Sequence, residues 1–451
     1  MNSNSSSSEK ATEFCEVEDG NLDAKHERSI EHIDSETVFS KEEQGKIIHH
    51  IDRRLVATTA AMYAVSPMDR TNLGNAAIAG MNEELGMEGD YRYSTIALVF
   101  FAMYTLLQPP ATVLCRKLGP RPFLSFLCFC WGVVMICFGF PKTWIPLIPL
   151  RLLLGVFEAG FFLGCVYLIS AWYARFDIQK RYAVFYLSET VLSGFSGILA
   201  YGIQQMDGLG GYSGWRWIFI LEGILSVIVA VIGWIYLVDF PDRLISKPAW
   251  GFLKVDEVEF VLRRINKDRG DSTAEPWNFK KWASSGLGSC LTTMAYALSY
   301  FLLIILKNNL HMSVAEAQCL TAPPSILAAI CMGFFAWAGD KYHVRGPLLL
   351  LNCLLGFIGL PLLGFAKQPA VRYFGTFLMC LSGQGAIPTA LAYHWNGALA
   401  YQANNITGHW KRAFCSASLI GAGGIGGIAG SLVFRAGCAE LSTGDICGVG
   451  V

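Results

Sequence analysis

Residues 55–80 read LVATTAAMYAVSPMDRTNLGNAAIAG, an apolar run that carries an adjacent acid and base, Asp69 and Arg70. The run is long enough to cross a bilayer, which takes about 20 apolar residues in a helix. A charge at membrane depth costs roughly 2.5–3.5 kcal/mol on insertion scales, so such a pair indicates a functional site. The alternative is that the two residues only neutralise each other or hold a helix contact. Asn72 and Asn75 add polar groups just beyond the pair and favour the functional interpretation.

Composition points to a membrane protein. The chain has 451 residues, of which 53% are hydrophobic and 16% charged, whereas soluble domains carry about 25% charged residues. The 46 glycines are typical of helices that pack closely in lipid. The net charge of zero gives no indication of nucleic acid as a partner. The 14 cysteines are scattered without paired CxxC motifs, so we expect neither a metal site nor a cofactor.

Apolar runs recur along the chain and predict an all-α polytopic protein built from two like bundles of six and five helices. The runs lie near 55–80, 91–114, 122–140, 144–172, 181–204, 216–238, 284–306, 313–338, 346–366, 371–400 and 413–434. The predicted organisation is a disordered cytoplasmic tail (1–50), a first bundle (51–238), a cytoplasmic central loop with an amphipathic helix (239–283), an incomplete second bundle (284–435) and an atypical tail (436–451).

Basic residues near the ends of the predicted spans are more frequent on the side that holds the amino terminus. The positive-inside rule therefore places that terminus in the cytoplasm. Each bundle has a short charged turn after its second helix, which we expect to hold helix ends together and to take part in gating. The candidate residues are Arg116, Lys117 and Arg121 in the first turn and Asp340, Lys341 and Arg345 in the second.

Several motifs together carry a family resemblance over about residues 50–435. The sequence resembles the major facilitator superfamily, and within it the fungal anion:cation symporters, a group of allantoate, nicotinate, pantothenate and biotin permeases. The matching stretches are DRTNLGNA (Asp69–Ala76), WG (Trp131–Gly132), RLLLGVFEAGFF (Arg151–Phe162), SAWY (Ser170–Tyr173), MDG (Met206–Gly208), GWRWIF (Gly214–Phe219) and NNITGH (Asn404–His409).

The sequence departs from that family in three places. The first basic turn contains no acid, and Leu163 stands where the family usually has a proline after the double phenylalanine. After Arg435 the chain reads to Val451 without an apolar run of span length, whereas the family continues into a twelfth helix. We therefore expect a truncated or wrongly spliced chain with eleven spans, whose transport competence depends on the missing helix.

The resemblance implies a symporter that binds an anion with a cationic side chain and couples protons through an acid. The arginine fork suits a carboxylate, which makes Arg70 and Arg151 the candidate cations. Asp69 and Glu158 are the candidate proton carriers. Glu158 lies seven residues after Arg151, which places both on one face of a helix. Each also has a structural alternative: a bonded arginine, or a buried neutral acid.

Further polar candidates lie elsewhere in the predicted spans. Glu189 and Glu222 are weaker candidates for proton coupling, while Gln384 and His394 offer polar groups for the substrate in the second bundle. Asn72 and Asn75 complete the predicted binding set.

The predicted function is proton-coupled uptake of a small organic anion, nicotinate-like or another vitamin or allantoate-like carboxylate, by alternating access between the bundles. The alternatives are a facilitator or drug-type exporter of the same fold, and a non-transporting sensor or truncated product. An enzyme is not expected, because the sequence shows no nucleophile–base pair. We expect a monomer in the plasma membrane.

Overall fold

A computed structural model of the chain describes residues 39–87, 92–173, 175–246, 249–270, 302–303, 306–307, 312–342, 345–366 and 368–394. The regular structure within these ranges is helical throughout. The chain forms two compact units, Met1–Ile51 and Asp52–Val451.

The first unit contains α2 (Lys41–Ile51). Its start is stabilised by a reciprocal cap, in which the Ser40 amide donates to the Glu43 carboxylate at 2.8 Å and the Glu43 amide donates to the Ser40 hydroxyl at 3.3 Å. Such a cap satisfies two backbone donors that the first turn of a helix leaves without partners. The prediction that the disordered tail runs to residue 50 is therefore wrong for residues 41–50.

The predicted span at 55–80 is a continuous helical segment with a wider turn at each end. A π-helix, η1 (Asp52–Val56), leads into α3 (Ala57–Ala76), and a second π-helix, η2 (Ala77–Met81), leads into the short α4 (Asn82–Glu84). Gly80 takes a φ of 106°, which redirects the chain at the end of this segment.

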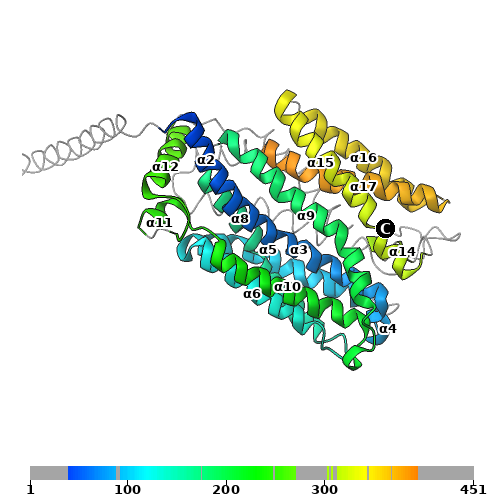
Figure 1. The fold of residues 1–451 in the computed structure, drawn as a ribbon. Helices are drawn as coiled ribbons and strands as arrows, with labels where there is room; N and C mark the ends of the chain where they lie inside the picture. The colour runs from blue at the N-terminus through cyan, green and yellow to red at the C-terminus, as the bar shows by residue number, and fades with distance from the viewer. Residues whose placement is uncertain are drawn as a thin grey trace, which may run out of the picture. The chain divides into compact units, whose positions relative to one another are not determined.

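The helices that follow correspond to the remaining predicted spans of the first bundle and to the central loop. Figure 1 shows α3 running alongside α9 and α10. Close packing of α6 on α10 rests on glycine, since a Cβ on Gly223 would lie 2.7 Å from the backbone nitrogen of Ile136. The elements are α5 (Arg92–Leu118), α6 (Pro120–Cys137), α7 (Leu147–Glu158), α8 (Phe161–Trp172), α9 (Arg175–Gln204), η3 (Leu209–Gly211), α10 (Gly214–Tyr236), α11 (Pro241–Ser246) and α12 (Val255–Gly270).

The second bundle is described in part. It contains α14 (Val314–Cys319), α15 (Ala322–Tyr342), α16 (Arg345–Phe365) and α17 (Pro369–His394). α15 and α14 pack against α9 of the first bundle, and α17 packs against both α15 and α16. The predicted span near 413–434, most of the span near 284–306 and the tail at 436–451 lie outside the described residues.

The predicted run at 144–172 divides into α7 and α8 at Ala159–Gly160, but it still counts as one span of 26 residues. Within the described ranges, five helices are long and apolar enough to cross a membrane, and a sixth is added if α5, bent by 55° near Pro109, is one span. α3 is not among them. The count of eleven spans therefore remains a prediction.

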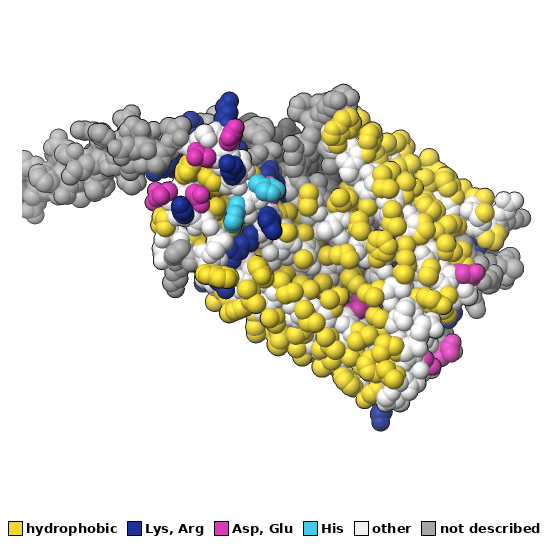
Figure 2. All heavy atoms as spheres, in the orientation of Figure 1, with side chains coloured by type: hydrophobic (Ala, Val, Ile, Leu, Met, Phe, Trp, Pro, Cys, Tyr) yellow, Lys and Arg dark blue, Asp and Glu magenta, His cyan; other side chains and the backbone are white. Residues whose placement is uncertain are grey.

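Hydrophobic side chains cover the surface over α6, α10 and α16, while charged side chains gather over α12 (Figure 2). On α10 the side chains of Ile228, Val231 and Ile235 are each about half exposed. A continuous apolar surface of this kind, over helices of span length, indicates contact with lipid. The chain is therefore an all-α, multi-pass membrane protein.

Candidate functional site

The polar residues of the opening stretch lie on α3 and are buried. Asp69, Arg70, Asn72 and Asn75 are between 0% and 6% exposed. Burying a charge is costly unless it is paired, so the contacts of these side chains determine what the site can do. Because consecutive residues of a helix point about 100° apart, α3 presents Asp69 and Arg70 to different neighbours.

One face of α3 forms a charged cluster with α7. Arg70 forms an ion pair with Glu158, and Ser66 donates a hydrogen bond to the same carboxylate oxygen. Ser66 and Arg70 can share this partner because residues four apart lie on one face of a helix. α5 completes the cluster, since the guanidinium of Arg70 lies 5.3 Å from the ring centroid of Tyr104 and 5.9 Å from that of Phe100.

The adjacent face of α3 meets α10. Ser226 donates to the Asp69 carboxylate at 3.5 Å, and the Asn72 amide donates to the Glu222 carboxylate at 2.5 Å. α3 and α10 place these pairs in order along one seam: Asp69 opposite Ser226, then Asn72 opposite Glu222. The side-chain oxygen of Asn72 and one carboxylate oxygen each of Asp69 and Glu222 accept no hydrogen bond from any described residue. Sequence reasoning singled out Glu222 only weakly and missed Ser226.

Arg151 lies on α7 and is fully buried, with 0% of its surface exposed. None of its three guanidinium nitrogens has a hydrogen-bond acceptor among the described residues. Its guanidinium carbon lies 5.1 Å from the ring centroid of Phe138, and its charge acts on Asp69. The expected proximity of Arg151 and Glu158 on one helix face does not produce a bond between them, because Glu158 pairs with Arg70.

The structure describes the contacts of the other predicted site residues only in part. The Glu189 carboxylate accepts a hydrogen bond from Thr190 at 3.4 Å, and its charge acts on Arg70. Both polar atoms of the Asn75 side chain are buried and have no hydrogen-bond partner within the described ranges. Gln384 and His394 belong to α17, but their side chains lie outside the described residues, so their relation to the cluster remains a prediction.

The basic turn of the first bundle ties helix ends together. Arg121 donates to the carbonyl of Trp234 at 2.7 Å, and Arg116 bonds the hydroxyl of Tyr167. Sequence reasoning missed the main contact, in which Arg243 donates to the carbonyls of Arg116, Lys117 and Leu118 at 2.8–3.0 Å. These are carbonyls of the last turn of α5, which has no intrahelical partners for them.

Asp239 lies next to this contact, 3.9 Å from Arg243. Burial raises the pKa of Asp239 despite the neighbouring guanidinium. In the second bundle, Asp340, Lys341 and Arg345 fall at the α15–α16 junction, but their side chains lie outside the described residues.

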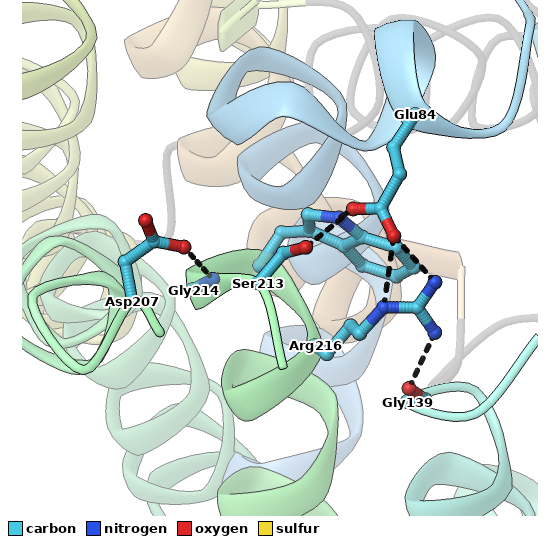
Figure 3. Close-up of polar contacts among 7 residues, drawn as sticks. Glu84, Gly139, Asp207, Ser213, Gly214 and Arg216 are labelled. Atoms are coloured by element: carbon cyan, nitrogen blue, oxygen red, sulfur yellow. Dashed lines mark hydrogen bonds and ion pairs between the residues drawn. The ribbon is translucent and has the colours of Figure 1, made fainter. Parts of the chain in front are cut away.

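At the opposite end of α10, Glu84 holds α4 against the start of that helix (Figure 3). Its carboxylate accepts hydrogen bonds from Ser213 and Trp215 at 2.6 Å and from Arg216 at 2.7 Å. Arg216 also donates to the carbonyl of Gly139 at 2.9 Å. Burial alone would raise the pKa of Glu84, but these hydrogen bonds outweigh it and lower the pKa.

Long apolar helices with a lipid-facing surface and buried charges among α3, α7 and α10 are typical of multi-pass membrane proteins that move polar solutes. The chain belongs to the Major Facilitator Superfamily, whose family model matches residues 59–431. This confirms the resemblance predicted from the motifs. Members of this superfamily are transporters and not enzymes, and this chain is a transporter.

Comparison with individual proteins agrees with that assignment. The chain is 28% identical over 412 residues to the MFS-type transporter cnsO of Penicillium expansum, covering 87% of this chain and 77% of that protein. It is 29% identical over 350 residues to the high-affinity nicotinic acid transporter of Saccharomyces cerevisiae, covering 75% and 63%. Its fold matches the structure of the proton:xylose symporter XylE with a TM-score of 0.62 at 14% identity, covering 85% and 89%.

Proposed function

We propose that the protein is a secondary active transporter that takes up a small organic anion together with protons, by alternating access between its two bundles. The substrate class is a carboxylate, such as a nicotinate-like, other vitamin or allantoate-like acid. The observation that carries the proposal is Arg151, a fully buried guanidinium with no acceptor among the described residues.

Arg151 is suited to bind the anion. A buried cation without a hydrogen-bonding partner is unfavourable, and a carboxylate would satisfy it with two parallel hydrogen bonds in the arginine fork. The charge of Asp69 acts on Arg151 but forms no bond with it. Arg151 therefore remains available to a ligand that enters between the helices.

Glu158 and Arg70 are suited to couple a proton to the anion. While Glu158 is ionised, it forms an ion pair with Arg70. Protonation of Glu158 would remove the negative charge from that pair and leave the Arg70 guanidinium to bind a second carboxylate oxygen of the substrate. Proton binding and anion binding would then favour each other, which is the linkage that symport requires.

One of the named relatives supports the substrate class. The transporter of Saccharomyces cerevisiae carries nicotinic acid, which is a small carboxylate. The proposal extends to a cytoplasmic amino terminus, a plasma-membrane location and a monomeric state, which follow from the charge bias of the sequence and the family resemblance.

The test is uptake of radiolabelled carboxylates by cells that express the protein, at an external pH of about 5 and about 7. Nicotinate is the first probe, with uncharged nicotinamide as its matched control. We expect accumulation of at least one carboxylate that is faster at the lower pH and that collapses with a protonophore. Uptake independent of pH would favour a facilitator, and efflux in place of uptake would favour an exporter.

A further inference from the structure

The seam between α3 and α10 contains a second pair of buried carboxylates, separate from the Arg70–Glu158 ion pair. Asp69 and Glu222 are each 1% exposed. Asp69 faces Ser226 of α10, and Glu222 lies four residues before Ser226 on that helix, which is about 6 Å along the helix axis at 1.5 Å per residue. The Ser226 hydroxyl lies 3.5 Å from the Asp69 carboxylate and 2.9 Å from the backbone carbonyl of Glu222, and its one hydrogen donates to either of these acceptors.

Neither carboxylate has a cation within bonding distance among the described residues. Glu222 accepts one hydrogen bond, from the neutral amide of Asn72, and Asp69 accepts one from Ser226. The second oxygen of each carboxylate is buried without a hydrogen-bond partner in the part of the chain that the structure describes, as is the side-chain oxygen of Asn72. Three unpartnered oxygens on one seam form a set that a positive charge would satisfy.

The charges facing this seam do not balance it. The groups whose charge acts on Asp69 are Glu222 on α10 and Glu158 and Arg151 on α7, and the Cys128 thiol of α6 is also in its field.

The charge of Glu189 on α9 acts on Arg70 and Tyr63 and is not among the charges that act on Asp69. With Arg70 paired to Glu158, Arg151 is the cation among the described residues whose charge acts on Asp69. Two ionised carboxylates would therefore leave one negative charge uncompensated in an apolar interior, where like charges cannot both ionise at low cost.

We propose that Asp69 and Glu222 together hold one proton on the α3–α10 seam, and that Glu222 is a residue of the coupling-ion site. This inference rests on the proposed proton coupling and adds to it a second proton position, apart from the anion-binding arginines. The two carboxylates titrate as a coupled pair, so the proton belongs to the pair and not to either residue. Asn72 orients Glu222, because its amide can donate to the carboxylate in either protonation state.

Infrared titration of the purified full-length protein tests the site without any substrate. Wild-type protein is expected to keep a protonated-carboxyl band to a higher pH than the variant Glu222→Gln. In that variant the charge that opposes ionisation of Asp69 is gone, so we expect the band to be lost about one pH unit lower or more. The double variant Asp69→Asn/Glu222→Gln is expected to lose the seam's contribution to the band altogether. Glu259→Gln on the exposed face of α12 is the matched control for a carboxyl-to-amide change.

Uptake measured on the same variants separates this inference from the proposed function. Glu222→Gln is expected to shift the pH midpoint of uptake toward acid, while Glu222→Asp, which restores the carboxyl group, moves it back toward the wild-type value. Uptake that depends on pH in the wild type, with a band and a midpoint unchanged in Glu222→Gln, would overturn the inference and leave the proposed function standing. If the band shifts in Glu222→Gln although the wild type transports no carboxylate, the shared proton on the seam would be supported and the proposed transport of carboxylates would be contradicted.

Sodium provides a further test. If replacing choline chloride by sodium chloride at constant pH removes the protonated band, the seam holds a metal cation in place of a proton, and the proposal is overturned.

The Glu222→Gln variant is expected to fold, because glutamine is nearly the same size as glutamate and keeps an oxygen that accepts the hydrogen bond from Asn72. A protonated-carboxyl band retained in Glu222→Asp would show that the protein folds with a substitution at this position.

Discussion

Asp69 and Arg70 are neighbours in the chain, yet their side chains engage different helices. Arg70 forms an ion pair with Glu158 of α7, whereas Asp69 accepts a hydrogen bond from Ser226 of α10 at 3.5 Å. The pair therefore does not neutralise itself. Each charge takes part in its own group of buried polar residues, one suited to an anion and the other to a proton.

Replacing Arg151 tests the anion site. We expect Arg151→Ala to abolish carboxylate uptake, because it removes the one described buried guanidinium that lacks an acceptor. Arg151→Lys keeps the charge but not the planar fork, and we expect it to lower apparent affinity by about tenfold or more, a loss of about 1.4 kcal/mol. Uptake is measured after surface biotinylation confirms equal amounts of protein. Wild-type uptake by the alanine variant would contradict the role of Arg151.

Replacing Glu158 tests the coupling. Glu158→Gln removes the negative charge of the ion pair with Arg70 while keeping the shape of the side chain. Since this mimics the protonated state, we expect exchange of labelled for unlabelled substrate to continue while uphill accumulation is lost. The exchange assay is the internal control for folding and binding. Accumulation at the wild-type rate would exclude Glu158 as the proton carrier.

The contact between the two bundles can be tested on one helix with two glycines. Gly197 of α9 faces the second bundle so closely that an added Cβ would meet the backbone carbonyl of Gln318, with the Thr321 hydroxyl at 2.7 Å. We expect Gly197→Val to lower stability by roughly 1–3 kcal/mol through overpacking and to slow uptake. Gly202→Val is the matched control, because nothing lies within 4 Å of a Cβ there. Equal apparent Tm values for the two variants in detergent would contradict this contact.

The Glu84 contact predicts a pH dependence. Its pKa is lowered below the usual value of 4.5, so its hydrogen bonds stabilise the fold above that pH and are lost as the pH falls through the lower folded value. In Glu84→Gln we expect a lower apparent Tm at neutral pH and a smaller fall below pH 4.5 than in the wild type. The carboxylate is partly exposed, so the loss at neutral pH is about 1 kcal/mol or less.

The neighbouring variant Glu83→Gln is the control for Glu84, because Glu83 is exposed. Its acid profile should match that of the wild type. A profile of Glu84→Gln that also matches the wild type would show that the contact contributes nothing to stability.

Local sequence patterns were enough to locate most helices of the first bundle. The apolar runs near 122–140 and 216–238 correspond to α6 and α10 with ends shifted by two or three residues. An apolar run that is buried or faces lipid must satisfy its backbone hydrogen bonds within the segment, which a helix does. The same patterns singled out Asp69, Arg70, Arg151 and Glu158, since charges in apolar runs are rare. They did not show that α2 begins before the predicted end of the tail.

Partner choice depended on how the helices are rotated and packed, which periodicity within one helix does not specify. The spacing of Arg151 and Glu158 placed both on one face of α7, yet Glu158 bonds Arg70 of α3 and leaves Arg151 without an acceptor among the described residues. Glu222 and Ser226 come close to Asp69 through the packing of α10 on α3, where a Cβ on Gly233 would meet the sulfur of Met62. The sequence thus identifies which charges are buried, and the packing of α3 against α7 and α10 determines which of them are paired.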